Sequence, residues 1–300
     1  MATTTALSWA VLAIALKYAL QTFSSGTIVW LRMALAFVLL LSYFLFRGRP
    51  ALKVLKRPPL GWVLAALLLA ANYYGFMKGI ELTTASNAQI MIQLAPLSFA
   101  FLSIFIFKEV PTLVQVGGML LALSGFGFFY WDQILVSWEH IESFQEGNLW
   151  LGIGSATWAV FALIQKFTLK DHKAVDFNLL VYGVSAFALL PIADLGELSR
   201  LSWSSGALIL FLGLNTVVAY GAFSEALSRI PASHVSMIIA MNPLLTLAIM
   251  TYLTQIQVEW IQGEPIHWRG FLGALFVVGG VILTLAAPAR LSRLKTSSTI

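Results

Sequence analysis

Two stretches of the chain share a residue pattern although they lie 147 positions apart. They read YYGFMKGIELTTASNAQIMIQLAPL (Tyr73–Leu97) and YGAFSEALSRIPASHVSMIIAMNPL (Tyr220–Leu244). Each begins with a tyrosine, has Ala-Ser at its thirteenth and fourteenth positions, and ends on Pro-Leu. A single identity of this kind arises by chance, but the common order of several does not. We therefore interpret the chain as an internal repeat.

The repeat extends in both directions. Upstream, Trp9 and Lys17 correspond to Trp158 and Lys166. Downstream the second copy carries an insertion, after which its residues Glu264, Gly273 and Gly280 correspond to Glu109, Gly118 and Gly125 of the first copy. The two copies cover residues 1–132 and 147–288, and residues 289–300 form a tail.

The composition places both copies in a membrane. Hydrophobic residues make up 59% of the 300 residues and charged residues 10%, whereas soluble proteins carry about 25% charge. The mean hydropathy is +0.85. A soluble fold cannot cover so much apolar surface, which excludes a soluble enzyme, a nucleic-acid-binding protein and a disordered chain. The chain has no cysteine, which excludes disulfides, thiolate metal sites and cysteine nucleophiles.

Ten apolar segments approach the length of about 20 residues that a spanning helix needs. They lie near residues 6–22, 24–46, 60–80, 84–107, 112–132, 148–168, 175–196, 204–228, 232–256 and 268–287. Their continuous hydrophobicity favours helices over a barrel. Each copy holds five segments, and because five is odd the second copy enters the membrane in the opposite orientation. The predicted fold is a single all-α membrane domain of ten transmembrane helices, arranged as two inverted five-helix repeats around a central cavity, which is typical of transporters.

The charges predict the orientation. The segment connections at 47–57 and 166–173 and the tail are rich in Lys and Arg, whereas the connection at 132–146 carries four acidic residues and no basic one. Basic loops stay in the cytoplasm. We therefore expect a multi-pass protein of a bacterial inner membrane with both termini cytoplasmic.

Specific motifs in both copies support a family resemblance. The first copy contains Thr84-Ala85-Ser86-Asn87-Ala88, Ala95-Pro96-Leu97, Glu109-Val110-Pro111-Thr112, Gln115, Gly117-Gly118 and Gly125; the second contains Ala232-Ser233-His234, Asn242-Pro243-Leu244, Glu264, Gly273 and Gly280. This pattern resembles the EamA-type repeat of the drug/metabolite transporter superfamily. The second copy departs by its insertion at Thr254–Gln262 and by Gly270 in place of Gln115. Within the superfamily, the chain is most similar to the YddG-type aromatic amino-acid exporters.

The resemblance implies a ten-helix basket. In such proteins the third, fourth, eighth and ninth helices surround a central cavity, and the first, second, sixth and seventh contribute to it. The fifth and tenth helices lie at the periphery.

A polar stripe on the fourth segment predicts part of the cavity lining. Ser86, Gln89, Gln93 and Pro96 are spaced three, four and three residues apart and share one helical face. Ser236 is one of the equivalent positions in the second copy. Such a stripe must face protein or water rather than lipid. It either lines a cavity or joins helices through hydrogen bonds.

Aromatic and amide side chains complete the candidate site. Tyr73 aligns with Tyr220 and Trp9 with Trp158, and each ring either contacts substrate or packs in the core. The predicted substrate-binding residues are Trp9, Asn72, Tyr73, Gln89, Gln93, Trp158, Tyr182, Asn215, Tyr220 and Ser236. No residue is expected to be catalytic or to bind a metal.

Pro96 and Pro243 are predicted hinges. Each lies near the middle of its segment and removes a backbone donor. The alternative is a static packing kink, but matched prolines suit two gates. Glu109 and Glu264 follow the two proline segments and are interpreted as capping or loop-anchoring groups.

Few ionisable residues lie inside the segments. Lys17 and Arg32 fall within two or three turns of the predicted outer ends, from where they can snorkel. No Asp or Glu lies near a helix midpoint, which favours a facilitator over a proton-driven or sodium-driven carrier. It also favours zwitterionic or neutral solutes over cationic drugs.

The sequence therefore predicts a non-enzymatic exporter of small amphiphilic metabolites that works by alternating access. Amino acids, aromatic ones included, are the expected substrates. The alternative is an exporter of drugs or sugar-type metabolites, with or without proton coupling. The expected partners are this small-molecule substrate and the lipid bilayer, with no nucleic acid and no cofactor, and a monomer is compatible with the sequence.

Overall fold

The computed structural model describes residues 1–47, 58–98, 102, 109–136, 140–229, 235, 238–261, 263–264, 266–286 and 290–291. The α-helices are α1 (Ala2–Ala19), α2 (Ser25–Phe46), α4 (Leu60–Leu82), α5 (Ala85–Met91), α7 (Leu113–Val136), α8 (Ile141–Thr168), α9 (Ala174–Leu189), α10 (Trp203–Arg229), α12 (Asn242–Gln255) and α13 (Trp268–Ala286). Two short 3-10 helices, η2 (Leu190–Ile192) and η3 (Leu195–Arg200), follow α9. Two two-residue strands, β1 (Glu109–Val110) and β2 (Arg290–Leu291), pair antiparallel.

Eight of the described helices are long and apolar enough to span a membrane, namely α1, α2, α4, α7, α8, α9, α10 and α13. The remaining two predicted segments are interrupted, so the described residues show eight spanning helices and two broken segments in place of the ten expected transmembrane helices. A turn at residues 92–93 follows α5, and a turn at 240–241 precedes α12. A proline follows each turn within three residues, and a proline cannot donate the backbone hydrogen bond that a continuous helix requires. Pro243 accordingly lies in the first turn of α12 rather than in mid-helix.

The helix ends differ from the apolar segments where polar residues continue a helix. Helix α8 begins at Ile141 and α7 continues to Val136. Much of the acidic connection expected at 132–146 is therefore helical. The expectation was wrong because an apolar run marks the part of a helix that lies in lipid, whereas the helix itself continues into water. Most of the basic loop 47–57 and of the tail lies outside the described residues.

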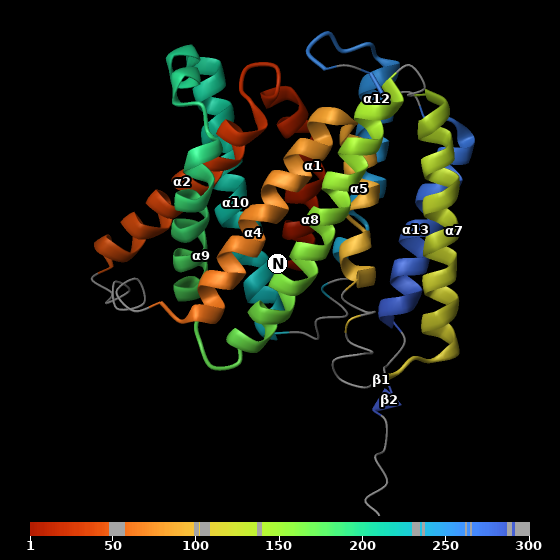
Figure 1. Ribbon diagram of the computed structural model, residues 1–300, viewed down its shortest axis with the longest axis horizontal. Coiled ribbons are helices and arrows are strands. Elements are labelled where there is room, and N and C mark those ends of the chain that lie inside the picture. The colour runs from red at the N-terminus through yellow and green to blue at the C-terminus, as the bar shows by residue number, and fades with distance from the viewer. Residues whose placement is uncertain are drawn as a thin grey trace, which may run out of the picture.

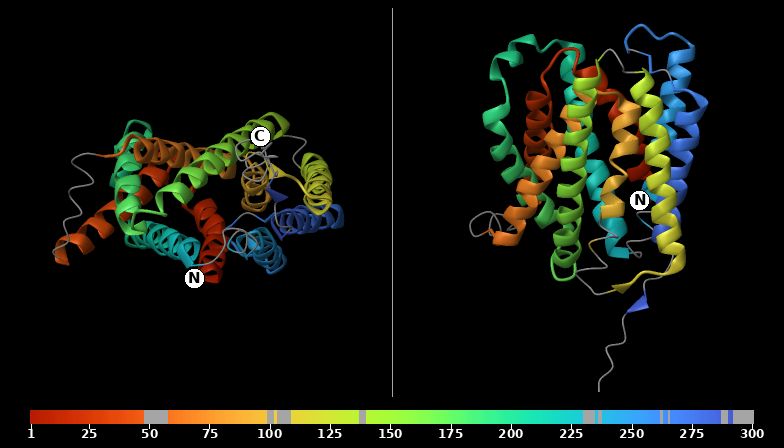
Figure 2. Two further views of the ribbon diagram at one scale, coloured as in Figure 1. Left: turned by 90° about the horizontal axis from the view of Figure 1, so that it is seen from below. Right: turned by 45° about the vertical axis from the view of Figure 1, so that its right-hand side comes forward.

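The helices form two groups, a pair and a larger bundle (Figures 1 and 2). Helices α7 and α13 pack on each other at one end of the bundle, on the right in both views of Figure 2. The other long helices form a larger group in which α4 contacts α8 and α9, and α10 contacts α1 and α2. This places α7 and α13, the predicted fifth and tenth helices, at the periphery.

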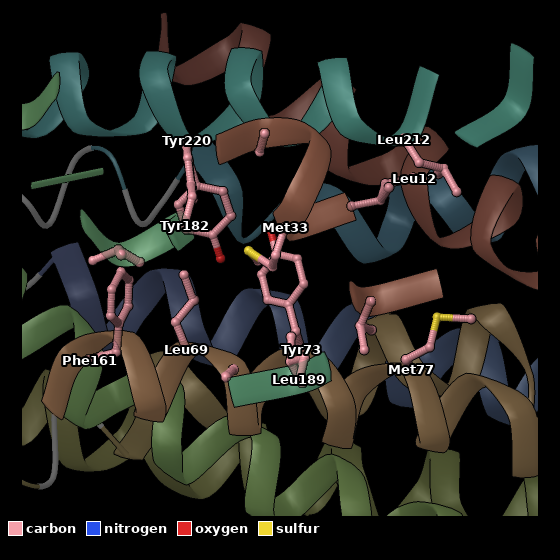
Figure 3. Packing of buried hydrophobic residues seen from close by; sticks show 14 of the residues in the cluster. Leu12, Met33, Leu69, Tyr73, Met77, Phe161, Tyr182, Leu189, Leu212 and Tyr220 are labelled. Atoms are coloured by element: carbon pink, nitrogen blue, oxygen red, sulfur yellow. The ribbon is translucent and has the colours of Figure 1, made fainter. Parts of the chain in front are cut away.

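The largest hydrophobic cluster lies in the larger group. Figure 3 shows Met33, Tyr73, Tyr182 and Tyr220 close together in this cluster, contributed by α2, α4, α9 and α10. Tyr182 is 1% exposed and Met33 is fully buried. Large side chains from both halves of the chain therefore share one core.

Glycines allow α7 and α13 to approach each other closely. A Cβ atom added at Gly280 would collide with the backbone of Ala122 and Gly118, whereas one added at Gly279 would find its nearest neighbour, Leu121 Cδ2, at 4.0 Å. Small residues of this kind are what lets membrane helices pack backbone to backbone.

We expect Gly280→Ala to lower the free energy of unfolding by about 1–3 kcal/mol, the usual effect of overpacking a tight contact. Gly279→Ala, at the adjacent position, is the matched control and should leave stability unchanged or slightly raised, because alanine favours helix over glycine by about 1 kcal/mol. Thermal unfolding of the two purified variants in one detergent measures the difference. Equal melting temperatures would contradict the described packing of α7 on α13.

Candidate functional site

A cavity lies among helices of both halves of the chain. The space not filled by protein atoms is about 840 Å³, its open mouth included. Its lining comes from α1, α2, α4, α5, α8, α10, the start of α12 and the residues at and next to the two helix interruptions. The lining residues are Trp9, Leu12, Arg32, Asn72, Tyr73, Phe76, Gln89, Ile92, Gln93, Ala95, Pro96, Trp158, Tyr220, Ile239, Ala240 and Asn242.

Most of the residues predicted from the sequence come together at this cavity. Seven predicted substrate-binding residues and one predicted hinge residue line it: Trp9, Asn72, Tyr73, Gln89, Gln93, Trp158, Tyr220 and Pro96. Lining a cavity is a placement and not yet a role, so substrate binding by these residues stays a prediction.

The other predicted residues lie elsewhere. Tyr182 is buried in the core on α9, and its hydroxyl has no hydrogen-bond partner among the described residues. Asn215 Nδ2 donates to the carbonyl oxygen of Ser8 at 3.1 Å and so joins α10 to α1. Pro243 lies in the first turn of α12 and is not part of the lining. Ser236 lies outside the described residues.

Aromatic rings form one wall of the cavity. The Trp9 ring lies 5.5 Å from the Tyr220 ring and 5.7 Å from the Phe223 ring, measured between centroids. Trp158, the repeat counterpart of Trp9, lies 6.1 Å from the same Phe223 ring. Tyr73 and Tyr220, the aligned tyrosines, are 6.1 Å apart. These distances are those of favourable aromatic contacts, so the two halves of the repeat meet in one aromatic cluster.

The amides of the lining divide into two kinds. Gln89 Nε2 donates to the carbonyl oxygen of Trp9 at 2.8 Å, and Asn72 Nδ2 donates to that of Gly154 at 2.9 Å. These two side chains therefore join helices in addition to lining the cavity. Asn242 differs, because its Oδ1 atom is buried and has no hydrogen-bond partner among the described residues. A buried acceptor without a partner is unfavourable, so a donor that reaches this atom would stabilise it.

Comparison with known protein families identifies the family of this chain. A model of the EamA-like transporter family matches residues 1–131 and 145–286, which together cover nearly the whole chain in two copies. The chain belongs to the EamA-like transporter family. The two matched ranges correspond closely to the two copies of the internal repeat.

Curated relatives of this EamA-family protein are named as transporters. The Escherichia coli (strain K12) protein named "Uncharacterized inner membrane transporter YhbE" is 31% identical over 288 residues, covering 94% of this chain and 89% of that protein. A Haemophilus influenzae protein named "Uncharacterized transporter" is 29% identical over 282 residues, covering 93% and 92%. Together with the apolar helices, these relatives make the chain a multi-pass transporter of the inner membrane.

A solved structure supports the fold. It carries the name "Crystal structure of protein" and superposes with a TM-score of 0.65 at 18% identity, covering 94% of each chain. At this level of identity the likeness concerns the fold alone.

A charged cluster surrounds the junction between α4 and α5, away from the cavity lining. Glu264, in the loop before α13, accepts hydrogen bonds from the backbone N–H groups of Ala85 at 2.7 Å and Ser86 at 3.0 Å. Lys17 Nζ donates to the carbonyl oxygens of Ile80 at 2.9 Å and Thr83 at 2.8 Å. The anion thus lies at the start of α5 and the cation at the end of α4, which is the favourable arrangement for both helix dipoles.

This cluster settles two expectations from the sequence. The capping and loop-anchoring role of Glu264 is confirmed. Snorkelling of Lys17 is not what the structure describes, because its ammonium group binds carbonyl oxygens at the end of a neighbouring helix. The side chain of Glu109, the repeat counterpart of Glu264, lies outside the described residues.

Two loop carboxylates have pKa values that depart from the ordinary value. Burial raises the pKa of the Glu264 carboxyl, although the hydrogen bonds from Ser86 and Ala85 and the nearby Lys17 act in the opposite direction. Burial also acts to raise the pKa of Glu197, in η3, but hydrogen bonds from Ser24 and Thr27, together with the positive charge of Arg200, outweigh it and lower that pKa. Glu197 accepts from the Ser24 N–H at 2.9 Å and from its hydroxyl at 3.0 Å. Both carboxylates therefore anchor a loop to a helix N-terminus.

Sequence reasoning missed Arg32 and Asn242 as lining residues. Arg32 was expected to snorkel, but it is 3% exposed and lines the cavity. The sequence carries no signal for this placement, because the segment is apolar all around; the structure shows that the buried residues Val29 and Ala36 share the helical face of Arg32. An arginine on the buried face of an apolar helix points to a functional site.

Proposed function

We propose that this transporter exports small amphiphilic metabolites, amino acids including aromatic ones, by alternating access and as a facilitator. The observation that carries the proposal is the cavity, which combines an aromatic wall with amide and guanidinium groups. A solute with an apolar side chain and a polar head matches such a lining. The sequence motifs, which resemble those of YddG-type aromatic amino-acid exporters, favour the same substrate class. The orientation with both termini in the cytoplasm is part of the proposal.

The helix contacts support two inverted repeats. Exchanging the two halves pairs α1 with α8, α2 with α9 and α4 with α10. Under this exchange the contact of α4 with α8 matches that of α10 with α1, and the contact of α4 with α9 matches that of α10 with α2. The helix interruptions at 92–93 and 240–241 also fall at nearly equivalent positions. Paired interrupted helices beside a central cavity suit alternating access.

The charge of the lining supports a facilitator. Among the described lining residues, the charged group is Arg32, a cation. Coupling to protons or sodium ions usually uses an intramembrane carboxylate. A carrier that depends on the gradient of its own substrate fits this lining better.

The proposal is tested by uptake of labelled phenylalanine, tryptophan and leucine into liposomes that contain the purified protein. We expect Trp158→Ala and Gln93→Ala each to lower the initial rate severalfold, because each removes lining that contacts the solute while leaving the fold intact. Drugs and sugars in the same assay test the alternative substrates.

The controls for these variants lie outside the cavity. Trp203 is 94% exposed at the start of α10, and Gln255 is exposed at the end of α12. Trp203→Ala and Gln255→Ala should keep the unsubstituted rate. No saturable uptake of any amino acid would contradict the substrate class, and unchanged rates in both cavity variants would remove the proposed site.

A further inference from the structure

Arg32 places a positive charge in the lining of the cavity. It lies on α2 and is 3% exposed. Its Nη2 atom donates to the Thr216 hydroxyl at 3.3 Å, and its guanidinium carbon lies 4.5 Å from the centroid of the Tyr73 ring. Both neighbours are uncharged, so they orient the guanidinium group without neutralising it.

The guanidinium group keeps an unused donor. Its Nε atom is buried and has no hydrogen-bond partner in the described part of the chain. No ion pair links Arg32 to an acidic residue within that part. A buried charge with an unsatisfied donor is unfavourable unless a counter-charge reaches it. A guanidinium group presents donors in a planar fork that matches a carboxylate.

The same lining holds an acceptor without a partner. Asn242 is 3% exposed at the start of α12, and its Oδ1 atom is buried and unpaired among the described residues. A carbonyl oxygen of this kind accepts a hydrogen bond from an ammonium group. Arg32 comes from the first half of the chain and Asn242 from the second, so a solute that binds both connects the halves.

We propose that Arg32 anchors the carboxylate of a transported α-amino acid and that Asn242 accepts a hydrogen bond from its ammonium group. The apolar side chain of the solute then lies against the aromatic wall formed by Trp9, Trp158 and Tyr220. This inference rests on the proposed function and adds the groups that recognise the substrate. It assigns the carboxylate, rather than the aromatic side chain, as the feature that every substrate shares.

The test uses four phenyl compounds that differ only in their charged groups. L-Phenylalanine carries both groups, L-phenylalaninamide lacks the carboxylate, 3-phenylpropionate lacks the ammonium group, and phenethylamine lacks the carboxylate. Each is added as a competitor to uptake of labelled L-phenylalanine into liposomes that contain the purified protein. In the unsubstituted protein we expect the amide to compete at least about tenfold more weakly than phenylalanine, since a site built for a polar group rejects an analogue that lacks it.

The two variants should lose different preferences. In Arg32→Gln the preference for phenylalanine over its amide should fall to within about twofold, while Arg32→Lys keeps part of it because the charge remains. In Asn242→Leu the preference for phenylalanine over 3-phenylpropionate should fall instead. Arg269→Gln is the matched control, because Arg269 is exposed and its guanidinium group also lies over a ring, that of Trp268. It should keep both preferences.

The melting temperature of Arg32→Gln separates a binding role of Arg32 from a purely structural one. If Arg32 binds the substrate, Arg32→Gln should not lower the melting temperature, because Arg32 has no acidic partner among the described residues. The melting temperature of this variant should then no longer rise when phenylalanine is added. Equal competition by phenylalanine and its amide in the unsubstituted protein, or an unchanged preference in Arg32→Gln, would overturn this inference alone. If Arg32→Gln does not fold, the inference is tested instead by the competition between phenylalanine and its amide in the unsubstituted protein and in Arg32→Lys. If no amino acid is taken up and none raises the melting temperature, the proposed function fails as well.

Discussion

Replacing Glu264 with alanine is expected to detach α5 from the loop before α13. The carboxylate oxygens of Glu264 accept both hydrogen bonds from the first N–H groups of α5. Helix α5 is seven residues long, and a helix of that length is marginal without such contacts. Removing the side chain leaves two buried N–H groups without partners. Losing charge-assisted bonds at a buried site costs about 2–4 kcal/mol.

Hydrogen exchange measures this loss directly. The amides of Ala85 and Ser86 should exchange at least about tenfold faster in Glu264→Ala, since each 1.36 kcal/mol corresponds to a factor of ten. Glu259→Ala is the matched control, because Glu259 is an exposed carboxylate in the same loop. Unchanged exchange in α5 of the Glu264 variant would contradict the capping role.

The raised pKa of Glu264 adds a pH dependence. A carboxyl whose pKa is higher in the closed junction than in the opened one binds its proton more tightly when closed. The closed junction is therefore favoured at low pH and loses stability as the pH rises from the ordinary value near 4.5 through the raised pKa. Exchange of the α5 amides, corrected for its intrinsic pH dependence, should increase over this window. Glu264→Gln is neutral, keeps an acceptor and should show no such increase.

Removing the prolines beside the helix interruptions is expected to slow transport without weakening substrate binding. Pro96 lies three residues after the turn at 92–93, and Pro243 lies two residues after the turn at 240–241. Each proline lacks a backbone N–H, so the helix cannot continue through the turn. Alanine at either position permits a continuous helix, which removes the joint at which the half-helices swing. We expect Pro96→Ala and Pro243→Ala each to lower the maximal rate about tenfold, a change of about 1.4 kcal/mol in the barrier.

The hinge prediction concerns the maximal transport rate and not the affinity for substrate. The maximal uptake rate should fall while the dissociation constant, measured by the shift in melting temperature with added phenylalanine, stays within about twofold of the unsubstituted value. Pro191→Ala is the control, because Pro191 is exposed at the start of η2 and lies away from the cavity lining. Full transport rates in both proline variants would show the interruptions to be static kinks.

Several parts of the fold could be predicted from the sequence because lipid imposes a simple rule on it. The segment expected at 24–46 is α2 within a residue, because Ser24 caps its first turn and accepts from the Thr27 N–H. The interruptions of the fourth and ninth segments were not predicted as breaks, although the prolines that cause them were. Hydropathy reports the length of an apolar run, and it does not report whether the backbone hydrogen bonds inside that run are continuous.

The cavity was predicted in its aromatic part and missed in its charged part. Trp9, Trp158, Tyr73 and Tyr220 were found because the repeat aligns them in pairs. Arg32 is not aligned with another arginine in the repeat. Its position two or three turns from the end of the helix suggested that its side chain snorkels to water, whereas it is buried in the cavity lining. Depth in a membrane protein is set by which helix face is buried, and that face becomes known only when the neighbouring helices are placed.

Counterflow in reconstituted liposomes tests the central claim most directly. Liposomes that contain the purified protein are loaded with unlabelled phenylalanine, and a trace of labelled phenylalanine is added outside. An alternating-access facilitator predicts a transient accumulation of label inside, with saturation by the external amino acid and no effect of a protonophore. Uptake that neither saturates nor shows counterflow would indicate a pore, and accumulation that needs a proton gradient would contradict the facilitator.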